Sequence, residues 1–180
     1  MADFFESITD RLRDFIEQQH MFFVGTAARD GRVNVSPKGM DTFRVLGPNR
    51  VVWLNLTGSG NETAAHLLDT NRITLMFCSF DRKPLILRLY GTATEVQPNQ
   101  DDWPDLSAHF PDLPGARQIF DVAIESVQTS CGYAVPRMTF DEERELLSTW
   151  ANKKGPDGVA AYHQEKNVVS IDGLPTGMRT

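Results

Sequence analysis

A tight-turn signal between two short apolar segments constrains the fold of this chain more than any other feature. Residues 22–28 form a short apolar run, and Asp30-Gly31 follows them almost directly. Residues 32–36 then alternate between apolar and polar side chains. Asp-Gly between two such runs is the strongest short-range signal for a β-hairpin. The pattern therefore predicts two antiparallel strands joined by a tight turn.

Four further segments have the composition of β-strands, being short, rich in β-branched and aromatic residues, and bounded by turn residues. They cover residues 50–56, 72–80, 84–96 and 120–125. Gly91 lies inside the longest of them, where a glycine indicates a bulge or a close approach of another backbone. Six strands joined mostly by hairpins predict an antiparallel sheet that closes into a small barrel. The expected fold class is mainly β, with peripheral helices.

Helical periodicity appears on both sides of the predicted strands. Apolar residues at spacings of three and four predict a helix over residues 3–19. Shorter helices are expected over residues 62–69 and 139–154, and within the proline-rich segment 97–117. No composition shift marks a domain boundary, so one domain is expected over residues 1–180. It comprises the N-terminal helix 3–19, a barrel over about 22–128, and a C-terminal helix and tail over 139–180.

Composition excludes several classes of protein. The apolar fraction of 41% is ordinary for a globular chain, and no apolar run approaches the roughly 20 residues of a membrane-spanning helix. The net charge of −6 argues against a nucleic-acid partner. The N-terminus carries acidic residues from Asp3 onward and lacks a basic leader, so it is not a secretory signal. We therefore expect a cytoplasmic protein with no membrane contact, whose Cys78 and Cys131 are reduced thiols.

Familiar catalytic motifs are absent. The segment GSGNET has Thr63 where a dinucleotide-binding GxGxxG motif needs its third glycine, and no phosphate-binding GxxxxGK[ST] motif occurs. The four histidines are scattered, so no metal site is expected. No side chain is identified as a catalytic residue.

One polar patch remains. Ser36 and Lys38 end the second predicted strand, and a run of small polar residues lies between the third strand and the next helix: Thr57, Ser59, Gly60, Asn61 and Thr63. Free N–H groups at a helix start favour an anion, and small residues let it approach. The patch is therefore either a phosphate site with Lys38 as a cation or an ordinary capped helix with Lys38 in solvent.

At this patch the chain resembles the pyridoxamine 5′-phosphate oxidase-like family of FMN-binding split barrels. Four stretches carry the resemblance: GTAARDGRVNVSPKG, NRVVWLNLTGSGNETAAHL, NRITLMFCSF and LYGTATEV, at residues 25–39, 49–67, 71–80 and 89–96. Two later stretches, at 129–136 and 165–177, are similar to a subgroup of oxidase-related proteins. The resemblance implies a six-stranded antiparallel split barrel and a homodimer with FMN at the subunit interface.

The resemblance also implies which residues would contact FMN. The family's phosphate-binding strand end falls on Val33, Asn34, Val35, Ser36 and Lys38, with the flavin ring near Val35 and Ser36. Its aromatic-Thr pair falls on Leu56 and Thr57. Its Ser-Arg-Lys triplet falls on Asn61, Glu62 and Thr63, where both basic residues are missing and an acid is present.

The missing basic residues leave the charge of a bound phosphate to Lys38. Arg44, Arg72 or Arg88 could assist it. The resemblance does not extend to the residues with which the family binds its pyridoxine substrate, so the expected substrate is an unidentified small organic molecule.

Two other functions fit the same residues. The first is a flavin- or haem-binding carrier, sensor or stress protein without turnover, in which His66 or His163 would be the haem ligand. The second is a reductase that uses deazaflavin or FAD, because an altered phosphate site could serve a different flavin. Loss of flavin affinity on replacing Lys38 by alanine would support the FMN assignment.

Overall fold

The computed structural model describes residues 2–178 and is built around one eight-stranded antiparallel sheet. The strands are β1 (Asp3–Phe5), β2 (Phe22–Ala27), β3 (Val33–Lys38), β4 (Phe43–Gly47), β5 (Arg50–Leu56), β6 (Ile73–Cys78), β7 (Ile86–Val96) and β8 (Ala116–Ser130). Their order in the sheet is β3-β2-β6-β7-β8-β5-β4, with β1 paired to β8. The two outer strands, β3 and β4, do not pair with each other. The antiparallel split-barrel class predicted above is confirmed, with eight strands in place of six.

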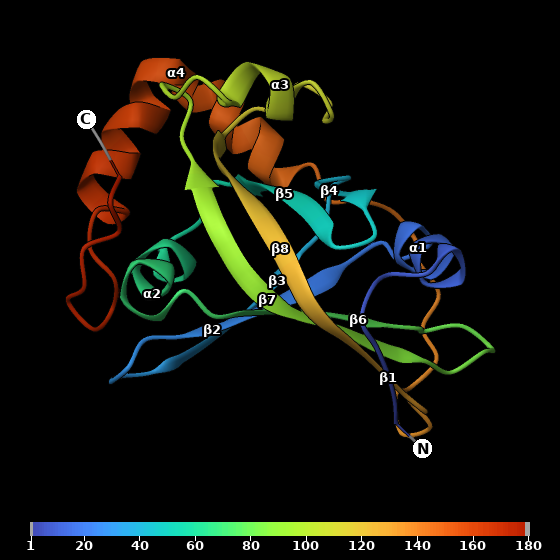
Figure 1. The fold of residues 1–180 in the computed structure, drawn as a ribbon. Coiled ribbons are helices and arrows are strands. Elements are labelled where there is room, and N and C mark those ends of the chain that lie inside the picture. The colour runs from blue at the N-terminus through green and yellow to red at the C-terminus, as the bar shows by residue number, and fades with distance from the viewer. Residues whose placement is uncertain (1, 179–180) are drawn as a thin grey trace.

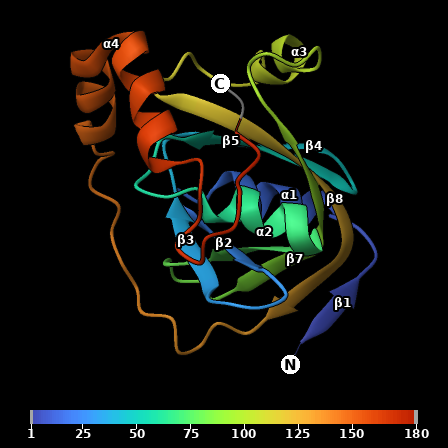
Figure 2. The same ribbon diagram turned by 90° about the vertical axis from the view of Figure 1, so that its left-hand side faces the viewer.

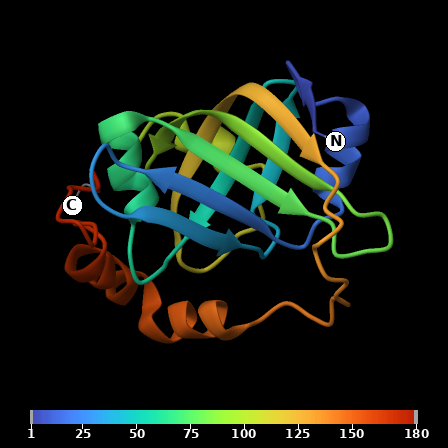
Figure 3. The same cartoon turned by 90° about the horizontal axis from the view of Figure 1, so that it is seen from below.

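Four helices lie around the sheet (Figure 1): α1 (Asp10–Glu17), α2 (Glu62–Thr70), α3 (Trp103–Ser107) and α4 (Leu146–Lys166). Helices α1 and α2 lie at opposite ends of it (Figures 1 and 3). The main core contains buried side chains of both helices and of five strands, among them Leu12, Trp53, Ala64, Leu89 and Phe120. Removing this apolar surface from water is the main driving force of the fold.

A second, smaller apolar cluster lies on the other face of β5 and β8. It contains Val52, Leu54 and Ile119 of these strands, and α3 covers it with Leu106. The central strand β8 is thus buried on both faces over part of its length. The run predicted as residues 120–125 extends to fifteen residues in the structure, because β8 pairs with β5, β7 and β1 along its length.

Gly91 marks a bulge, as predicted. The register of β7 against β8 shifts between Tyr90 and Gly91. A Cβ atom at Gly91 would lie against the carbonyl oxygen of Ala123, closer than any real contact. Only glycine allows the two longest strands to approach this closely.

The N-terminal helix is shorter than predicted. Residues 3–5 pair with Val127–Thr129 of β8 as strand β1, and the helix begins at Asp10. Thr9 sets this start, because its side-chain oxygen accepts a hydrogen bond from the backbone N–H of Leu12 at 3.4 Å. Phe4, which the helical pattern assigned to the apolar face, is exposed. Strand pairing with β8 outweighs the local periodicity here.

The C-terminal region also differs from the prediction. The helix predicted over 139–154 begins at Leu146, and residues 139–145 have no regular structure. A kink at Gly155 (φ 69°) interrupts the helix, and Pro156 starts a second helical stretch that ends at Lys166. The tail after Lys166 runs back along α2 and β3 (Figure 2). Residues 179–180 of the predicted tail lie outside the described residues.

Candidate functional site

A cavity of about 560 Å³ lies where β3, the start of α2, β8 and the C-terminal tail meet. We call it the Lys38 cavity. Seven of the eleven predicted site residues line it: Asn34, Ser36, Lys38, Ser59, Gly60, Asn61 and Thr63. The structure thus brings the strand end and the loop before α2 together, as the polar patch predicted.

Strand β3 presents its two faces to different surroundings. Asn34, Ser36 and Lys38 are half-buried and line the cavity. Val33 and Val35 alternate with them and are 72% and 65% exposed. The alternation read from the sequence is therefore correct, and the two valines lie outside the cavity on an edge strand of the sheet.

Leu56 and Thr57 also lie outside the Lys38 cavity. They line an adjoining hollow of about 300 Å³, which Lys38 and Gly58 share. The Thr57 hydroxyl donates to the carbonyl oxygen of Gly115 at 2.8 Å and lies 2.7 Å from Nε2 of His163. Because the hydroxyl has only one hydrogen, Nε2 of His163 must donate the second bond. Thr57 therefore ties the loop to α4.

Lys38 has an unusual environment for a lysine. Its Nζ donates to Oδ1 of Asn55 at 3.2 Å and lies 5.1 Å from the centre of the Trp53 ring. Burial, with a smaller contribution from the positive charge of Arg117, lowers the pKa of Lys38 to about 8. Below this pH, Lys38 places a partly desolvated positive charge in the cavity.

Arg117 of β8 supplies a second cation that the sequence analysis did not identify. Its side chain is only 4% exposed and lines the cavity. Its Nη1 donates to the carbonyl oxygen of Gly60 at 3.0 Å and to Oδ1 of Asn167 at 2.7 Å. Burial lowers the pKa of Arg117 to about 10, so the guanidinium remains charged at neutral pH. The signal in the sequence was an Arg-Gln pair directly before the apolar residues Ile119 and Phe120.

Within residues 2–178, no carboxylate forms an ion pair with Arg117. The three arginines suggested from sequence do not line this cavity. Arg44 binds Asp41 and Arg88 binds Ser130, at other positions in the sheet. The arginine that lines the cavity beside Lys38 is therefore Arg117, and not one of the three suggested from the sequence.

Two buried donors in the cavity lack partners. Asn61 is 2% exposed, and its Oδ1 accepts from Nε2 of Gln118 at 3.0 Å, while its Nδ2 has no partner among the described residues. Nε of Arg117 is likewise unpartnered. A buried donor without an acceptor costs about 1–3 kcal/mol. A phosphate oxygen in the cavity would accept from such donors, so the residues present fit the phosphate group of a flavin nucleotide.

Glu62, the acid in place of the family's basic residues, has a different partner. Its carboxylate oxygens accept hydrogen bonds from the backbone N–H of Ile171 at 3.1 and 3.2 Å. The negative charge is thus used to hold the tail against the start of α2. The acid that departs from the family pattern therefore contacts Ile171, a residue of the tail that lines the cavity.

Further contacts fix the tail as a wall of the cavity. Asn167 is fully buried, and its Nδ2 donates to the carbonyl oxygen of Gly58 at 3.1 Å. Thr176 donates to the carbonyl oxygen of Asn167 at 2.7 Å. Asp172 binds both the backbone and the side chain of Arg32 at the β2–β3 turn.

Neither histidine named as a haem ligand lines the Lys38 cavity. His66 is buried, with Nδ1 3.1 Å from the hydroxyl of Thr26. Nε2 of His163 is hydrogen-bonded to the hydroxyl of Thr57. Burial, with a smaller contribution from the positive charge of Arg117, lowers the pKa of His163 to about 4.

Residues 2–178 contain no cluster of three or more potential metal-ligating side chains. None of their helices is both long and apolar enough to cross a membrane. Cys78 and Cys131 are both free thiols.

The fold and the cavity define a split-barrel protein with a polar cavity, lined by Lys38 and Arg117, at the start of a helix. The family model of pyridoxamine 5′-phosphate oxidase matches residues 8–131. The protein ustO of Aspergillus flavus, described as a pyridoxamine 5′-phosphate oxidase family protein, is 38% identical over 97% of this chain and 78% of its own. The chain belongs to the pyridoxamine 5′-phosphate oxidase family.

Solved structures support the fold. HupZ of Group A Streptococcus is 21% identical with a TM-score of 0.55, covering 68% of this chain and 99% of the other. A Clostridium acetobutylicum protein related to general stress protein 26, of the pyridoxinephosphate oxidase family, is 18% identical with a TM-score of 0.51. It covers 71% of this chain and 89% of its own. At these identities the likeness concerns the fold alone.

Proposed function

We propose that the protein is an FMN-binding oxidoreductase that acts on a small organic molecule in the cytoplasm. One observation carries the proposal: two partly desolvated cations and two unpartnered buried donors converge on one cavity at the start of α2. Membership of the pyridoxamine 5′-phosphate oxidase family supports a flavin as the ligand.

In this proposal the phosphate group of FMN is held by the Lys38 cavity. Lys38 and Arg117 neutralise its charge, because an ammonium and a guanidinium form strong charge-assisted bonds to phosphate. Asn61 and the first backbone N–H groups of α2 donate further bonds. Glu62 also lines the cavity, and its carboxylate oxygens accept hydrogen bonds from the backbone N–H of Ile171 in the tail. Arg117 thereby replaces the basic residues that the loop lacks.

The flavin supplies the redox chemistry when it is bound. The chain's own residues bind and orient it, and residues 169–171 cover the cavity. Lys38 holds a proton on Nζ up to about pH 8. No step of the proposed reaction requires another side chain as acid or base.

The proposal includes a homodimer with the flavin ring at the interface. Val33 and Val35 are exposed on β3, which is an edge strand of the sheet. An exposed apolar edge strand favours association with another chain. A second copy packed here would cover both valines and place its own side chains beside the flavin ring, near Val35 and Ser36.

The first test is an absorption spectrum of the purified protein, with identification of the chromophore released on denaturation. Oxidised flavin bands and released FMN are expected. A colourless protein that does not take up added FMN would contradict the proposal, and a haem Soret band would assign a different cofactor. A flavin that no nicotinamide donor can reduce would indicate a carrier or sensor.

The second test is a titration with FMN. Lys38→Ala removes a charge-assisted bond worth about 1.5–3 kcal/mol, so affinity should fall by about tenfold or more. Lys153→Ala, which removes an exposed lysine of α4, is the matched control and should bind FMN normally. Unchanged affinity in Lys38→Ala would refute the phosphate assignment.

A further inference from the structure

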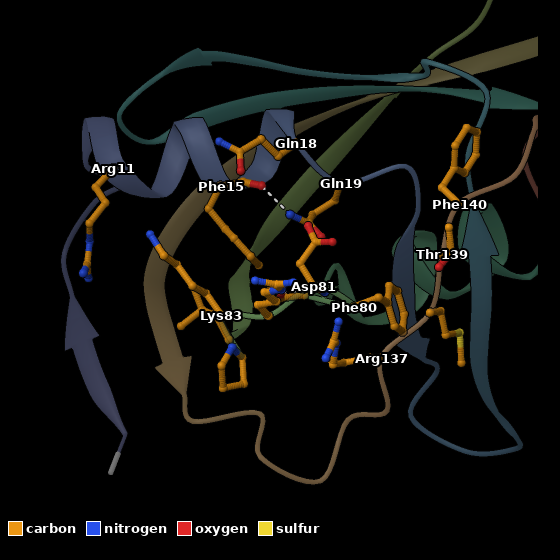
Figure 4. Close-up of a pocket in the computed structure, with 15 residues that line it drawn as sticks. Arg11, Phe15, Gln18, Gln19, Phe80, Asp81, Lys83, Arg137, Thr139 and Phe140 are labelled. Carbon is orange, nitrogen blue, oxygen red and sulfur yellow. Dashed lines mark hydrogen bonds between the residues drawn. The ribbon is translucent and has the colours of Figure 1, made fainter.

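A second and larger cavity, of about 950 Å³, lies at the end of the barrel that α1 covers (Figure 4). Its walls are α1, the turn of residues 79–85 between β6 and β7, and the segment 137–140 after β8. It shares no lining residue with the Lys38 cavity. Its volume lies within the range of small-molecule sites, about 300–1,000 Å³. We call it the basic cavity.

Positive charge is concentrated in the basic cavity. Its lining includes one acidic residue, Asp81. It also includes four basic residues: Arg11, Arg82, Lys83 and Arg137. Within residues 2–178, none of the four basic side chains forms an ion pair. The whole chain carries a net charge of −6, so this cluster runs against the overall balance. Four unpaired cations around one hollow attract a ligand with several negative charges.

Aromatic side chains accompany these cations. Phe15 and Phe80 are half-buried in the lining, and Phe140 is 46% exposed. Phe140 stacks on His20 with ring centres 3.7 Å apart and planes 8° apart. Such exposed ring surface favours stacking with a planar ligand.

Backbone and side-chain bonds hold the walls together. The N–H of Met138 donates to the carbonyl oxygen of Phe80 at 3.1 Å, which joins the segment 137–140 to the turn. Nε2 of Gln19 donates to the carbonyl oxygen of Phe15 at 2.8 Å (Figure 4). The first bond joins two walls of the cavity, and the second fixes the side chain of Gln19 at the end of α1.

We propose that the basic cavity binds a nucleotide-like small molecule, with an aromatic ring and at least two anionic phosphate groups. The phosphates pair with the arginines and Lys83, because positively charged side chains form charge-assisted hydrogen bonds to phosphate oxygens. The ring packs against the phenylalanines. This site is separate from the flavin site of the proposed function and does not depend on it.

Calorimetric titration with ATP, in the absence of divalent cations, tests the site. ATP should bind, whereas adenosine and inorganic tripolyphosphate should bind at least about tenfold more weakly, since each lacks one half of the recognised chemistry. Absence of ATP binding would overturn the proposal. Tripolyphosphate that binds as well as ATP would overturn the aromatic part of it.

Variants locate the binding. Arg11→Ala with Arg137→Ala should weaken ATP binding about tenfold or more, and Phe140→Ala several-fold. All three side chains are exposed, so their loss should leave the circular dichroism spectrum unchanged. The control Lys153→Ala removes a charge elsewhere and should have no effect. ATP affinity that is indifferent to the cavity variants would overturn the assignment.

Lys38→Ala separates this proposal from the proposed function. It should lower FMN affinity and leave ATP affinity unchanged, and the arginine double variant should show the reverse. ATP binding that depends on Lys38 would place the nucleotide in the other cavity and overturn the inference. A protein that binds ATP at the basic cavity without binding FMN would contradict only the proposed function.

Discussion

The two cavities of this protein are both lined by cations, but the cations differ in their surroundings. In the Lys38 cavity, Arg117 is buried and donates to Gly60 and Asn167, and Lys38 donates to Asn55. In the basic cavity, Arg11, Arg82, Lys83 and Arg137 are exposed and have no ion pairs among the described residues. The first cavity presents hydrogen-bonded cations that are buried or half-buried, whereas the second presents exposed cations without ion pairs in the part of the chain that the structure describes.

The difference has consequences for binding. Burial removes water from Lys38 and Arg117 and lowers their pKa values to about 8 and about 10. A bound anion restores favourable interactions to these charges, so each should contribute strongly and with defined geometry. Exposed cations are already hydrated and are screened by salt, so each contributes less. We therefore expect a single substitution to weaken binding more in the Lys38 cavity than in the basic cavity.

The largest expected effect follows from removing the buried guanidinium. Arg117→Met should lower FMN affinity by about 100-fold, because a charge-assisted bond and an unpartnered donor are lost together. Equilibrium titration measures the change, and circular dichroism verifies the fold. An affinity within threefold of the unaltered protein would show that Arg117 does not contact the ligand.

The next comparison exchanges arginine for lysine in both cavities. Arg117→Lys should lower FMN affinity by about tenfold, since lysine cannot reproduce the bonds to Gly60 and Asn167 while also meeting a ligand. Arg137→Lys should change ATP affinity by less than about twofold, because an exposed charge is largely interchangeable. If FMN affinity in Arg117→Lys and ATP affinity in Arg137→Lys fell by the same factor, buried and exposed cations would not differ in their contribution to binding.

Proton binding to Lys38 gives a smaller effect. Because the pKa of Lys38 is lowered to about 8, the ammonium form is present below this pH and lost above it. FMN affinity should therefore fall by nearly twofold between pH 7 and pH 8 and more steeply above pH 8, by at most about tenfold per pH unit. Lys38→Arg keeps its charge and should abolish the decline. The same decline in Lys38→Arg would assign it to another group.

The smallest effect concerns stability near the Lys38 cavity. The pKa of His163 is lowered to about 4 from an ordinary value of 6.5. Between these values the unfolded chain binds a proton that the folded chain does not, so stability falls as pH decreases through this window.

His163→Gln should reduce the loss of melting temperature between pH 7 and pH 5. His109→Gln, at an exposed histidine, is the control and should retain the full loss. Parallel losses in the unaltered protein and both variants would show that folding does not lower the pKa of His163.

Local patterns predicted much of the sheet. The Asp30-Gly31 hairpin, the two faces of β3 and the bulge at Gly91 all follow from residues that are close together in the sequence. Strand β4 was missed, because residues 43–47 lack the regular alternation of a half-buried strand. Strand β1 was assigned to a helix, because its pairing with β8 connects residues more than 120 positions apart.

Local sequence patterns were enough to predict the antiparallel sheet and to identify Lys38 and the loop before α2 as one polar patch. The residues that complete this patch become visible only in the folded molecule. Arg117 meets Gly60 across 57 positions of the chain, and the tail meets Glu62 across 109. No periodicity encodes such contacts, because they depend on where two separately formed elements pack. The sign of the charge at Glu62 could be read from the sequence, but its partner, the backbone of Ile171, exists only in the folded molecule.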